Sequence, residues 1–353
     1  MCNFPVASVM LGTKKRKRRI GDSIIWIVIM RRSIRFVFMV MLLATMGRQA
    51  RAQQVSVAPY HGGRLAALSL TFDDGLLDQY TLAYPELKRR SLRATFAIIG
   101  SKVGGVMRSK QDRQDGTDGT PCMTWDMLRE MAADGMEISS HGWSHQAVTR
   151  LDKEALRHEV QHNDTVIFLQ TGQFPRTYFY PGNAKNEACI AYCEQDRVGS
   201  RTFQTSIGSK RDTTWLCRWV DGLIAKGEWG VGMTHGIAQG YDHFRDPQVM
   251  WTLLDYLVQK QQQIWVAPFC EVAAYIKERQ HTRLDVSRAD GRTVIKPSCT
   301  LSAHIFTQTL TLVVEGESPL HAMQDGKELK RSSKDGVTLI DFNPHGGEIV
   351  VSY

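Results

Sequence analysis

Between residues 64 and 280, short apolar runs alternate with longer stretches in which apolar residues recur every three to four positions. Short apolar runs are typical of strands buried on both faces, and the three-to-four spacing is typical of helices with one buried face. Their alternation predicts βα units arranged around a parallel sheet. The expected strands are 65–72, 94–99, 136–140, 177–180, 199–205, 230–234 and 264–269. The expected helices are 82–90, 124–134, 153–169, 215–226 and 247–263.

After residue 281 the helical spacing disappears and single-residue alternation replaces it. The alternating stretches are 309–314, 337–342 and 348–353, with glycine-containing turns between them. This pattern predicts a small antiparallel β domain. We therefore divide the chain into a leader (1–52), an α/β domain (53–280) and a β-rich accessory domain (281–353), which either binds the same ligand as the first domain or packs on it. Residues 100–122 are expected to form a surface insertion.

The net charge of +8 belongs to the N-terminal leader rather than to the folded body. Residues 1–52 contain eleven Lys and Arg but one acidic residue, which leaves 33 basic against 35 acidic side chains in the remainder. The body is thus nearly neutral. Its charge gives no reason to expect a nucleic-acid partner.

The leader has the pattern of a secretory signal peptide. The basic stretch 31–35 precedes an apolar run at 36–47, and Ala50, Arg51 and Ala52 follow with small residues around an expected cleavage near Ala52–Gln53. A run this short does not cross a hydrocarbon core of ~30 Å, so no stable membrane span is expected in the mature chain. We expect a periplasmic or extracellular protein, with translation starting at Met1 or Met30. Six cysteines follow the leader, and either disulfides or buried thiols suit them.

Residues capable of chemistry follow several of the expected strands. Asp73 and Asp74 end the first strand, where Gly75 permits a sharp turn, and His141 and His145 end the third. Two histidines four residues apart are able to hold a divalent ion, and a carboxylate from another strand end would complete three protein ligands. Parallel βα architectures gather such residues at the carboxyl edge of the sheet.

Two further strand ends extend this set. Pro181 and Gly182 form a turn after the fourth strand whose backbone N–H groups suit an oxyanion, and His235 ends the sixth strand, where it is placed to deliver a proton. Taken singly, each of these motifs also fits an ordinary loop or a buried histidine. Their joint occurrence at one sheet edge favours a catalytic site.

The order of these motifs resembles that of the polysaccharide deacetylase family (carbohydrate esterase family 4, the NodB-homology domain). The motifs are Thr-Phe-Asp-Asp-Gly at 71–75, Ser-His-x3-His at 140–145, Tyr-Pro-Gly at 180–182 and Thr-His-Gly at 234–236. The likeness covers about residues 64–280. It implies an α/β fold, a distorted (β/α) barrel of about seven parallel strands. It also implies metal-dependent removal of N- or O-linked acetyl groups from a polysaccharide or oligosaccharide.

The resemblance also implies a role for each matching residue. Asp73 matches the catalytic base and His235 the catalytic acid. Asp74, His141 and His145 match the ligands of a divalent metal, with Zn²⁺ expected first and Co²⁺ or another ion as alternatives. The backbone N–H of Gly182 matches an oxyanion donor. Aromatic residues near the strand ends are candidates for sugar contact, namely Trp143, Tyr180, Trp229, Tyr241 and Phe244.

Two positions depart from the family pattern. Relatives often carry an arginine two residues before the proline of the third motif, where this chain has Phe179, so we expect a less ionised base. The family also has an aspartate that orients the acid histidine, for which Asp212 and Asp221 are both candidates. The alternatives are a catalytically inactive carbohydrate-binding protein on the same fold and a two-metal phosphoesterase, which needs more ligands than this set offers. The glycan, the bond type and the oligomeric state stay open.

Overall fold

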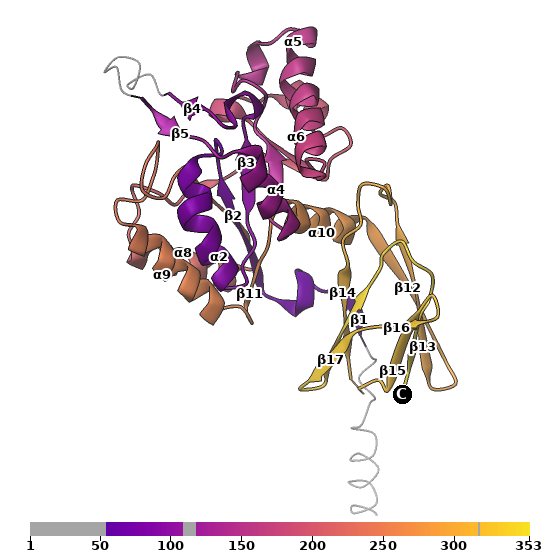
Figure 1. Ribbon diagram of the computed structural model, residues 1–353. Coiled ribbons are helices and arrows are strands. Elements are labelled where there is room, and N and C mark those ends of the chain that lie inside the picture. The colour runs from indigo at the N-terminus through magenta and orange to yellow at the C-terminus, as the bar shows by residue number, and fades with distance from the viewer. Residues whose placement is uncertain (1–53, 109–117, 317) are drawn as a thin grey trace, which may run out of the picture. The chain divides into compact units, whose positions relative to one another are not determined.

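A computed structural model of the chain describes residues 54–108, 118–316 and 318–353 (Figure 1). The expected leader, residues 1–52, lies outside the described residues, as does the middle of the expected insertion at 100–122. The flanks of that insertion form a two-stranded antiparallel pair, β4 (Val106–Met107) and β5 (Thr120–Pro121). None of the helices in the described ranges combines the length and apolar character that a bilayer crossing needs.

A parallel sheet forms the first domain. Its strands are β2 (Ala66–Phe72), β3 (Thr95–Ile98), β6 (Glu137–Ser140), β7 (Thr177–Phe179), β8 (Gly199–Arg201), β9 (Thr205–Ser206), β10 (Trp229–Thr234) and β11 (Ile264–Val266). They lie in the order β8-β7-β6-β3-β2-β10-β9, with β11 on the first half of β2, and each neighbouring pair is parallel. The seven expected strands are confirmed, with the fifth divided into β8 and β9.

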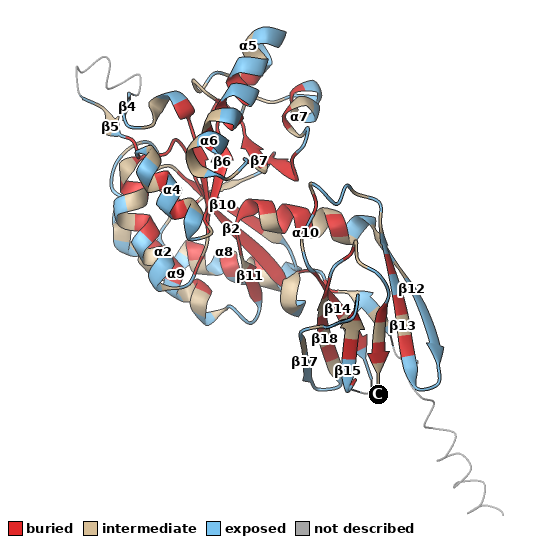
Figure 2. Ribbon diagram, turned by 45° about the vertical axis from the view of Figure 1, so that its right-hand side comes forward, coloured by how far each residue is buried: buried red, intermediate tan, exposed pale blue. Residues whose placement is uncertain are grey.

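The sheet curls into a distorted (β/α) barrel. Its edge strands, β8 and β9, are separated by only three residues in the chain, so the two edges must lie near each other. Every residue of β2 is buried, because helices cover the outside of the sheet and side chains fill the inside (Figure 2). Both the fold class and the barrel predicted from the sequence are confirmed.

Helices connect most of these strands. The α-helices are α2 (Tyr84–Arg89), α4 (Trp125–Ala133), α5 (Lys153–Arg157), α6 (Asn163–Thr171), α7 (Glu187–Cys193), α8 (Thr213–Lys226), α9 (Pro247–Gln259) and α10 (Phe269–His281). Single π-helical turns occur at Gln79–Ala83 and His158–His162, and 3₁₀ turns at His61–Gly63, Gly100–Lys102, Val148–Arg150 and Pro181–Asn183. The expected helix 153–169 is thus α5, a π-helical turn and α6. The sequence did not predict α7 or α10.

The C-terminal residues form two antiparallel sheets, as expected. One contains β14 (Leu310–Glu315), β17 (Arg331–Lys334) and β18 (Val337–Phe342); the other contains β12 (Thr282–Ala289), β13 (Arg292–Cys299), β15 (His321–Gln324), β16 (Lys327–Glu328) and β19 (Ile349–Ser352). One strand comes from elsewhere in the sequence: β1 (Val55–Val57) pairs with β14. The C-terminal module therefore includes residues that precede the barrel, which the sequence division at residue 281 did not anticipate.

Helix α10 closes the amino-terminal end of the barrel. The Phe269 N–H donates to Thr95 Oγ1 and the Cys270 N–H donates to Glu137 Oε2, and Thr95 and Glu137 are the first residues of β3 and β6. The other side of α10 packs on the C-terminal module through a shared core that includes Tyr275. The opposite, carboxyl-terminal end of the strands is therefore the end left for a site.

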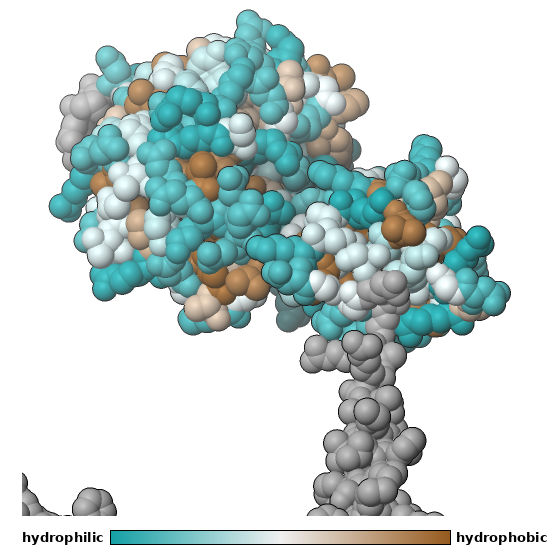
Figure 3. Space-filling model, turned by 90° about the horizontal axis from the view of Figure 1, so that it is seen from below, coloured by the Kyte–Doolittle hydropathy of each residue, from teal (hydrophilic) through white to brown (hydrophobic). Residues whose placement is uncertain are grey.

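One face of the molecule is largely hydrophilic, and most cysteines of the described residues are buried. On the face shown in Figure 3, hydrophobic side chains form small separate groups within a largely hydrophilic surface. The six cysteines of the described residues are all free, and Cys122, Cys189, Cys193 and Cys270 are buried. The cysteines are thus thiols, four of them packed in the interior.

Candidate active site

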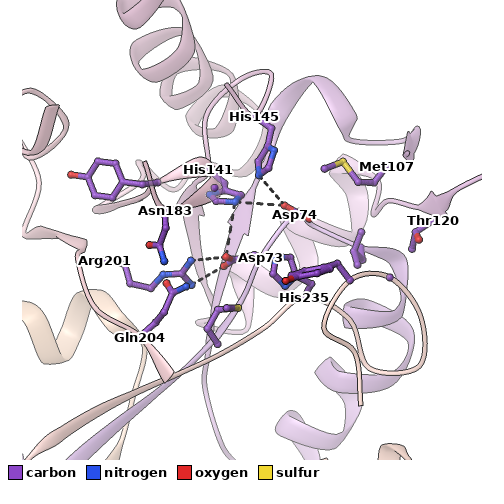
Figure 4. A pocket seen from close by; sticks show the side chains of 16 residues that line it. Asp73, Asp74, Met107, Thr120, His141, His145, Asn183, Arg201, Gln204 and His235 are labelled. Atoms are coloured by element: carbon purple, nitrogen blue, oxygen red, sulfur yellow. Dashed lines mark hydrogen bonds and ion pairs between the residues drawn. The ribbon is translucent and has the colours of Figure 1, made fainter. Parts of the chain in front are cut away.

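The first motif places two carboxylates directly after β2. Asp73 and Asp74 are 3% and 7% exposed, and Asp74 and Gly75 both have left-handed backbone, with φ of 74° and 72°. A left-handed non-glycine residue costs on the order of 1–3 kcal/mol, and such residues cluster at functional sites. Asp73 pairs with Arg201 and Asp74 with His145, and both carboxylates also face His141 Nε2, at 4.0 and 3.5 Å (Figure 4).

Asp74 meets the two histidines of the second motif. The Asp74 Oδ1 atom lies 3.5 Å from His141 Nε2 and 3.6 Å from His145 Nε2, and the three ligand atoms lie within 4.8 Å of one another. This oxygen is buried and has no hydrogen-bond partner among the described residues. Ligand bonds of about 2.0–2.2 Å around one tetrahedral ion put ligand atoms roughly 3.3–3.6 Å apart, so the site fits a divalent metal.

Partners outside the triad orient both imidazoles. The His141 Nδ1 atom lies 2.8 Å from the Phe179 carbonyl oxygen, and donation to that oxygen leaves the Nε2 lone pair facing Asp74. His145 has left-handed backbone, with φ of 63°, on a loop held by buried Glu159. The Glu159 carboxylate accepts the N–H groups of Ser144 and Gln146 at 3.0 Å. Glu159 was not predicted, because it lies in a helical turn outside the motifs.

Asp73 pairs with an arginine that the sequence did not predict. Arg201, the last residue of β8, donates from Nη1 to Asp73 Oδ1 at 2.8 Å and from Nη2 to Asp73 Oδ2 at 2.5 Å. Its guanidinium carbon lies 4.1 Å from the centre of the Phe179 ring. The phenylalanine at the family's arginine position thus lies against an arginine from the next strand.

This pairing overturns the expectation of a less ionised base. Burial alone would raise the pKa of Asp73, but the positive charge and hydrogen bonds of Arg201, with His141 and His235 nearby, bring it below its ordinary value. Burial also lowers the pKa of His141 to about 4, against the opposing effect of the two aspartates. Asp73 is therefore a carboxylate and His141 a neutral imidazole near pH 7.

His235 follows β10 and lies at the same end of the barrel. The Asp73 N–H donates to the Thr234 carbonyl at 3.0 Å, which places the two strand ends side by side. The His235 ring is half-buried and meets the exposed Tyr241 ring edge to face, with centroids 5.0 Å apart. The structure thus brings the expected base and the expected acid into one pocket.

Neither expected acid-orienting aspartate reaches His235. The Asp212 carboxylate caps α8 by accepting the Trp215 N–H at 2.7 Å. Asp221 lies within α8 and pairs with Lys260 Nζ at 2.9 Å. Both carboxylates are occupied by local structural partners, so the orienting role predicted for Asp212 or Asp221 is not supported.

Of the residues predicted to contact the substrate, some line the pocket and others do not. Gly182, with φ of 59°, and Tyr180 both line the pocket, although the Tyr180 hydroxyl is engaged by Ser200 Oγ at 2.9 Å. Trp143 does not line it, because its ring packs on His162 with centroids 4.5 Å apart. The predicted sugar contact from Trp143 is therefore not supported. The Trp143 indole also lies against Gly100, where a Cβ atom would come within 2.7 Å of the ring.

The pocket has a volume of about 720 Å³. Besides the residues above, it is lined by Met107 and Thr120 of the β4–β5 pair and by Asn183, Gln204 and Met233. Figure 4 shows His141, His145 and Asp74 on one side of Asp73, and Arg201 on another. An ionised carboxylate, a triad able to hold a metal ion and a half-buried histidine in one cleft form a set suited to hydrolysis by activated water.

Comparison with known proteins gives this set a family context. Residues 64–198 match the sequence model of the family described as polysaccharide deacetylase. Over 144 residues the chain is 26% identical to the peptidoglycan-N-acetylglucosamine deacetylase PgdA of Listeria monocytogenes, covering 40% of this chain and 26% of PgdA. Over 126 residues it is 27% identical to YxkH of Bacillus subtilis, covering 36% of this chain and 40% of YxkH. The chain thus spans about a quarter to two fifths of the length of these relatives.

Among solved structures, the peptidoglycan deacetylase PdaC of Bacillus subtilis is similar, with 19% identity and a TM-score of 0.43, over 61% of this chain and 93% of that one. Two observations bear on the family: the sequence match over residues 64–198, and the gathering of the four motifs at one end of a parallel barrel. Over residues 64–198 the chain is thus similar to the polysaccharide deacetylase family.

Proposed function

We propose that this chain is a metal-dependent hydrolase that removes acetyl groups from an acetylated polysaccharide or oligosaccharide. The observation that carries the proposal is the buried, unpartnered Asp74 Oδ1, which faces two imidazole nitrogens at 3.5 and 3.6 Å. Leaving a buried carboxylate oxygen without a partner is costly, and a cation held by all three residues removes that cost.

Asp74, His141 and His145 would hold the metal. When bound, a divalent ion at this place supplies a Lewis acid for the acetyl carbonyl and lowers the pKa of water from 15.7 toward ~7. Histidine and aspartate ligands suit Zn²⁺, and Co²⁺ is the next candidate. The low pKa of His141 supports this role, because only the neutral imidazole has a lone pair to give.

Asp73 would act as general base. Arg201 uses one lone pair on each Asp73 oxygen, and a carboxylate has about four such sites, so capacity remains to receive a proton from water. The Arg201 pair keeps the carboxylate ionised and fixes its plane. The base is thus held in the right charge state by a partner that leaves it free to react.

His235 would act as general acid for the departing amine or sugar oxygen. It lies in the same pocket as Asp73, on the neighbouring strand end, and its half-buried ring is open to a substrate. Gly182 also lines the pocket, and its backbone N–H would stabilise the oxyanion. These roles need no covalent intermediate, so no serine or cysteine nucleophile is required.

The substrate class rests on the family, and PgdA, by its name, acts on peptidoglycan N-acetylglucosamine. The proposed location is outside the cytoplasm, on the basis of the leader pattern. The test is acetate release by the purified chain from acetylated chitin-like oligomers, peptidoglycan and acetylated xylan. We expect release that stops with a chelator and returns with Zn²⁺ or Co²⁺.

The matched variant is Asp73→Asn, which keeps the shape of the base but removes its charge. It should bind one metal per chain yet lose about 10²–10⁴ of the turnover, which is the usual contribution of a general base. Activity that survives chelation would contradict the metal role. Binding of the glycans without acetate release would instead favour a carbohydrate-binding protein.

A further inference from the structure

Two buried polar residues follow the first motif without belonging to it. Asp78 and Gln79 are 2% and 0% exposed and stand at the start of the π-helical turn Gln79–Ala83. Neither side chain lines the pocket. Both are directed to the segment that carries His235, which lies more than 150 positions later in the chain.

Gln79 bridges the backbone of the base to that of the acid. Its Nε2 donates to the Asp73 carbonyl and to the His235 carbonyl, each at 2.6 Å. The pairing of β2 with β10 ends at Phe72 and Thr234. One more backbone hydrogen bond follows, from the Asp73 N–H to the Thr234 carbonyl. One carboxamide therefore continues the connection between the two strands past the point where the sheet ends.

Asp78 holds the turn that follows His235. Its Oδ2 accepts the N–H groups of Ile237, Ala238 and Gln239 at 2.7, 2.8 and 3.2 Å. The turn is tight, since a Cβ atom on Gly236 would lie 1.8 Å from the Gln239 carbonyl oxygen. Three converging donors fix this turn against the end of β2, because a buried carboxylate with several N–H partners has little freedom to move.

The His235 ring lacks a carboxylate partner of its own. Its Nδ1 is buried and accepts or donates no hydrogen bond among the described residues. Asp212 and Asp221 are engaged elsewhere on α8. Among the described residues, no carboxylate therefore orients the ring, and the backbone at His235 sets where its side chain starts.

We propose that Asp78 and Gln79 are positioning residues that fix the acid His235 relative to the base Asp73 through the backbone, in place of an aspartate on the imidazole. The roles of acid and base rest on the proposed function. A change of about 1 Å in such a spacing costs on the order of 10²-fold in rate, so the two residues bear on turnover although neither touches the substrate.

The first test is Gln79→Leu, with Gln173→Leu as the matched control. Gln173 also binds two backbone groups, the Ile138 N–H and the Met136 carbonyl, but at the amino-terminal end of β6. Both variants should lower the thermal unfolding temperature. Gln79→Leu should lower kcat about 10- to 100-fold with KM within about threefold. Gln173→Leu should leave both constants within about twofold, and an equal kcat loss in the two variants would overturn the proposal.

The second test is conservative rescue at Asp78. Asparagine keeps one acceptor oxygen for the three N–H groups, whereas alanine keeps none, so Asp78→Asn should retain several times more kcat than Asp78→Ala. Equal kcat in these two variants, with both folded by circular dichroism, would count against a positioning role.

The third readout does not need activity. The His235 imidazole Cε1–H signal, assigned by its absence from His235→Gln in histidine-labelled protein, should shift in Gln79→Leu and stay in place in Gln173→Leu. An unmoved signal in Gln79→Leu would overturn the proposal. Absence of acetate release by the wild type would instead contradict the proposed function, and the signal would still decide the positioning role.

Discussion

The two ends of the barrel both contain buried carboxyl groups, but the groups differ in their partners. At the amino-terminal end, Glu137 accepts from Thr95 Oγ1 at 2.7 Å, Thr177 Oγ1 at 2.5 Å and the Cys270 N–H at 2.9 Å. At the carboxyl-terminal end, Asp74 Oδ1 is equally hidden from solvent and has no partner among the described residues. The Glu137 carboxyl is fully hydrogen-bonded within the chain, whereas Asp74 keeps an oxygen that is able to bind a ligand.

An unpartnered oxygen does not by itself mark a functional carboxyl, since Asp78 Oδ1 and Asp164 Oδ1 are also buried without a hydrogen-bond partner among the described residues. Asp74 Oδ1 differs because it faces two imidazole nitrogens, at 3.5 and 3.6 Å. A buried carboxyl whose oxygens are all hydrogen-bonded contributes to stability, whereas an unpartnered oxygen costs roughly 1–3 kcal/mol or more. Burial raises the pKa of Glu137, while Asp73 at the other end is kept ionised by Arg201. Burial is thus common to both ends, and only the set of partners distinguishes them.

Asp74→Asn is the change with the largest expected effect. The amide keeps the shape but is a poor metal ligand, so we expect loss of bound metal and a fall in acetate release on the order of 10³ or more. The stability of the metal-free protein should stay level or rise, because an unpaired buried charge is removed. Elemental analysis, activity and thermal unfolding measure the three outcomes.

Glu137→Gln is the control from the other end of the barrel. It should bind one metal per chain and keep activity within a few-fold. It should unfold at a lower temperature, because the NH₂ group of glutamine would face hydroxyl groups that donate to Glu137 in the wild type. If Asp74→Asn bound as much metal as the wild type, Asp74 would not be a metal ligand, and the proposed difference between Asp74 and Glu137 would be wrong.

Arg201→Met is expected to have the next largest effect. Without the guanidinium, burial raises the pKa of Asp73 unopposed. We expect turnover to fall about 10- to 100-fold near pH 7. The acid limb of the pH–rate curve should move to higher pH, since the base then needs a higher pH to ionise.

Arg197→Met provides the matched control for this prediction. Arg197 pairs with Asp164, and both side chains are buried but lie outside the pocket. Its loss should lower stability without moving the acid limb. An unmoved acid limb in Arg201→Met would mean that Arg201 does not set the charge of the base.

How far the sequence predicts this site depends on whether a role is encoded in contiguous residues. Five of the predicted residues lie within short motifs at strand ends and line one pocket, namely Asp73, Asp74, His141, His145 and His235. Arg201 acts on a residue 128 positions away, and its local sequence reads as an ordinary strand. Pattern analysis detects local order, so partners that meet only through the tertiary fold were missed.

The same reasoning explains the errors in the fold. Helix α10 has buried residues on nearly all sides, so no single apolar face marked it, and the end of the expected strand 264–269 overlapped its start. Strand β12 is exposed along most of its length, so it shows no buried alternation. Strands β2, β3 and β10 were found because they are largely apolar and buried throughout or nearly so. Strand β6 is also buried, although Ile138 is its one apolar residue.

Glu278, near the end of α10, offers a smaller and pH-dependent effect where this helix meets the C-terminal module. Both of its oxygens accept the Gln308 N–H, at 3.1 and 2.9 Å, and burial raises its pKa to about 7. The folded state therefore binds a proton more tightly than the unfolded state, so stability is full at low pH and falls as pH rises past the unfolded pKa through about 7.

Glu278→Gln removes this titration while keeping an acceptor for Gln308. The variant and the wild type should unfold at similar temperatures near pH 5, and the variant should be more stable near pH 8 by about 1–3 kcal/mol. Denaturant unfolding at the two pH values measures the difference. A wild type that gains stability relative to the variant as pH rises would show that Glu278 is paired as a carboxylate, with His345 Nε2 at 3.5 Å as its partner.

The smallest expected effect concerns exposed aromatic rings. Tyr241 is 76% exposed, lines the pocket and meets the His235 ring, so its face is available to the apolar side of a sugar ring. Phe203 is also exposed, but its ring packs on Trp229, the first residue of β10, and does not line the pocket.

Tyr241→Ala should therefore raise KM about 3- to 10-fold with kcat within about twofold, because an exposed stacking contact contributes about 1 kcal/mol to substrate and transition state alike. Tyr241→Phe should behave as the wild type, since the ring is kept. Phe203→Ala should change stability but not KM. If Tyr241→Ala lowered kcat instead, the ring would be acting on His235 rather than on the sugar. The carboxyl-terminal end of the barrel would then depend on contacts between its own side chains, as the amino-terminal end does.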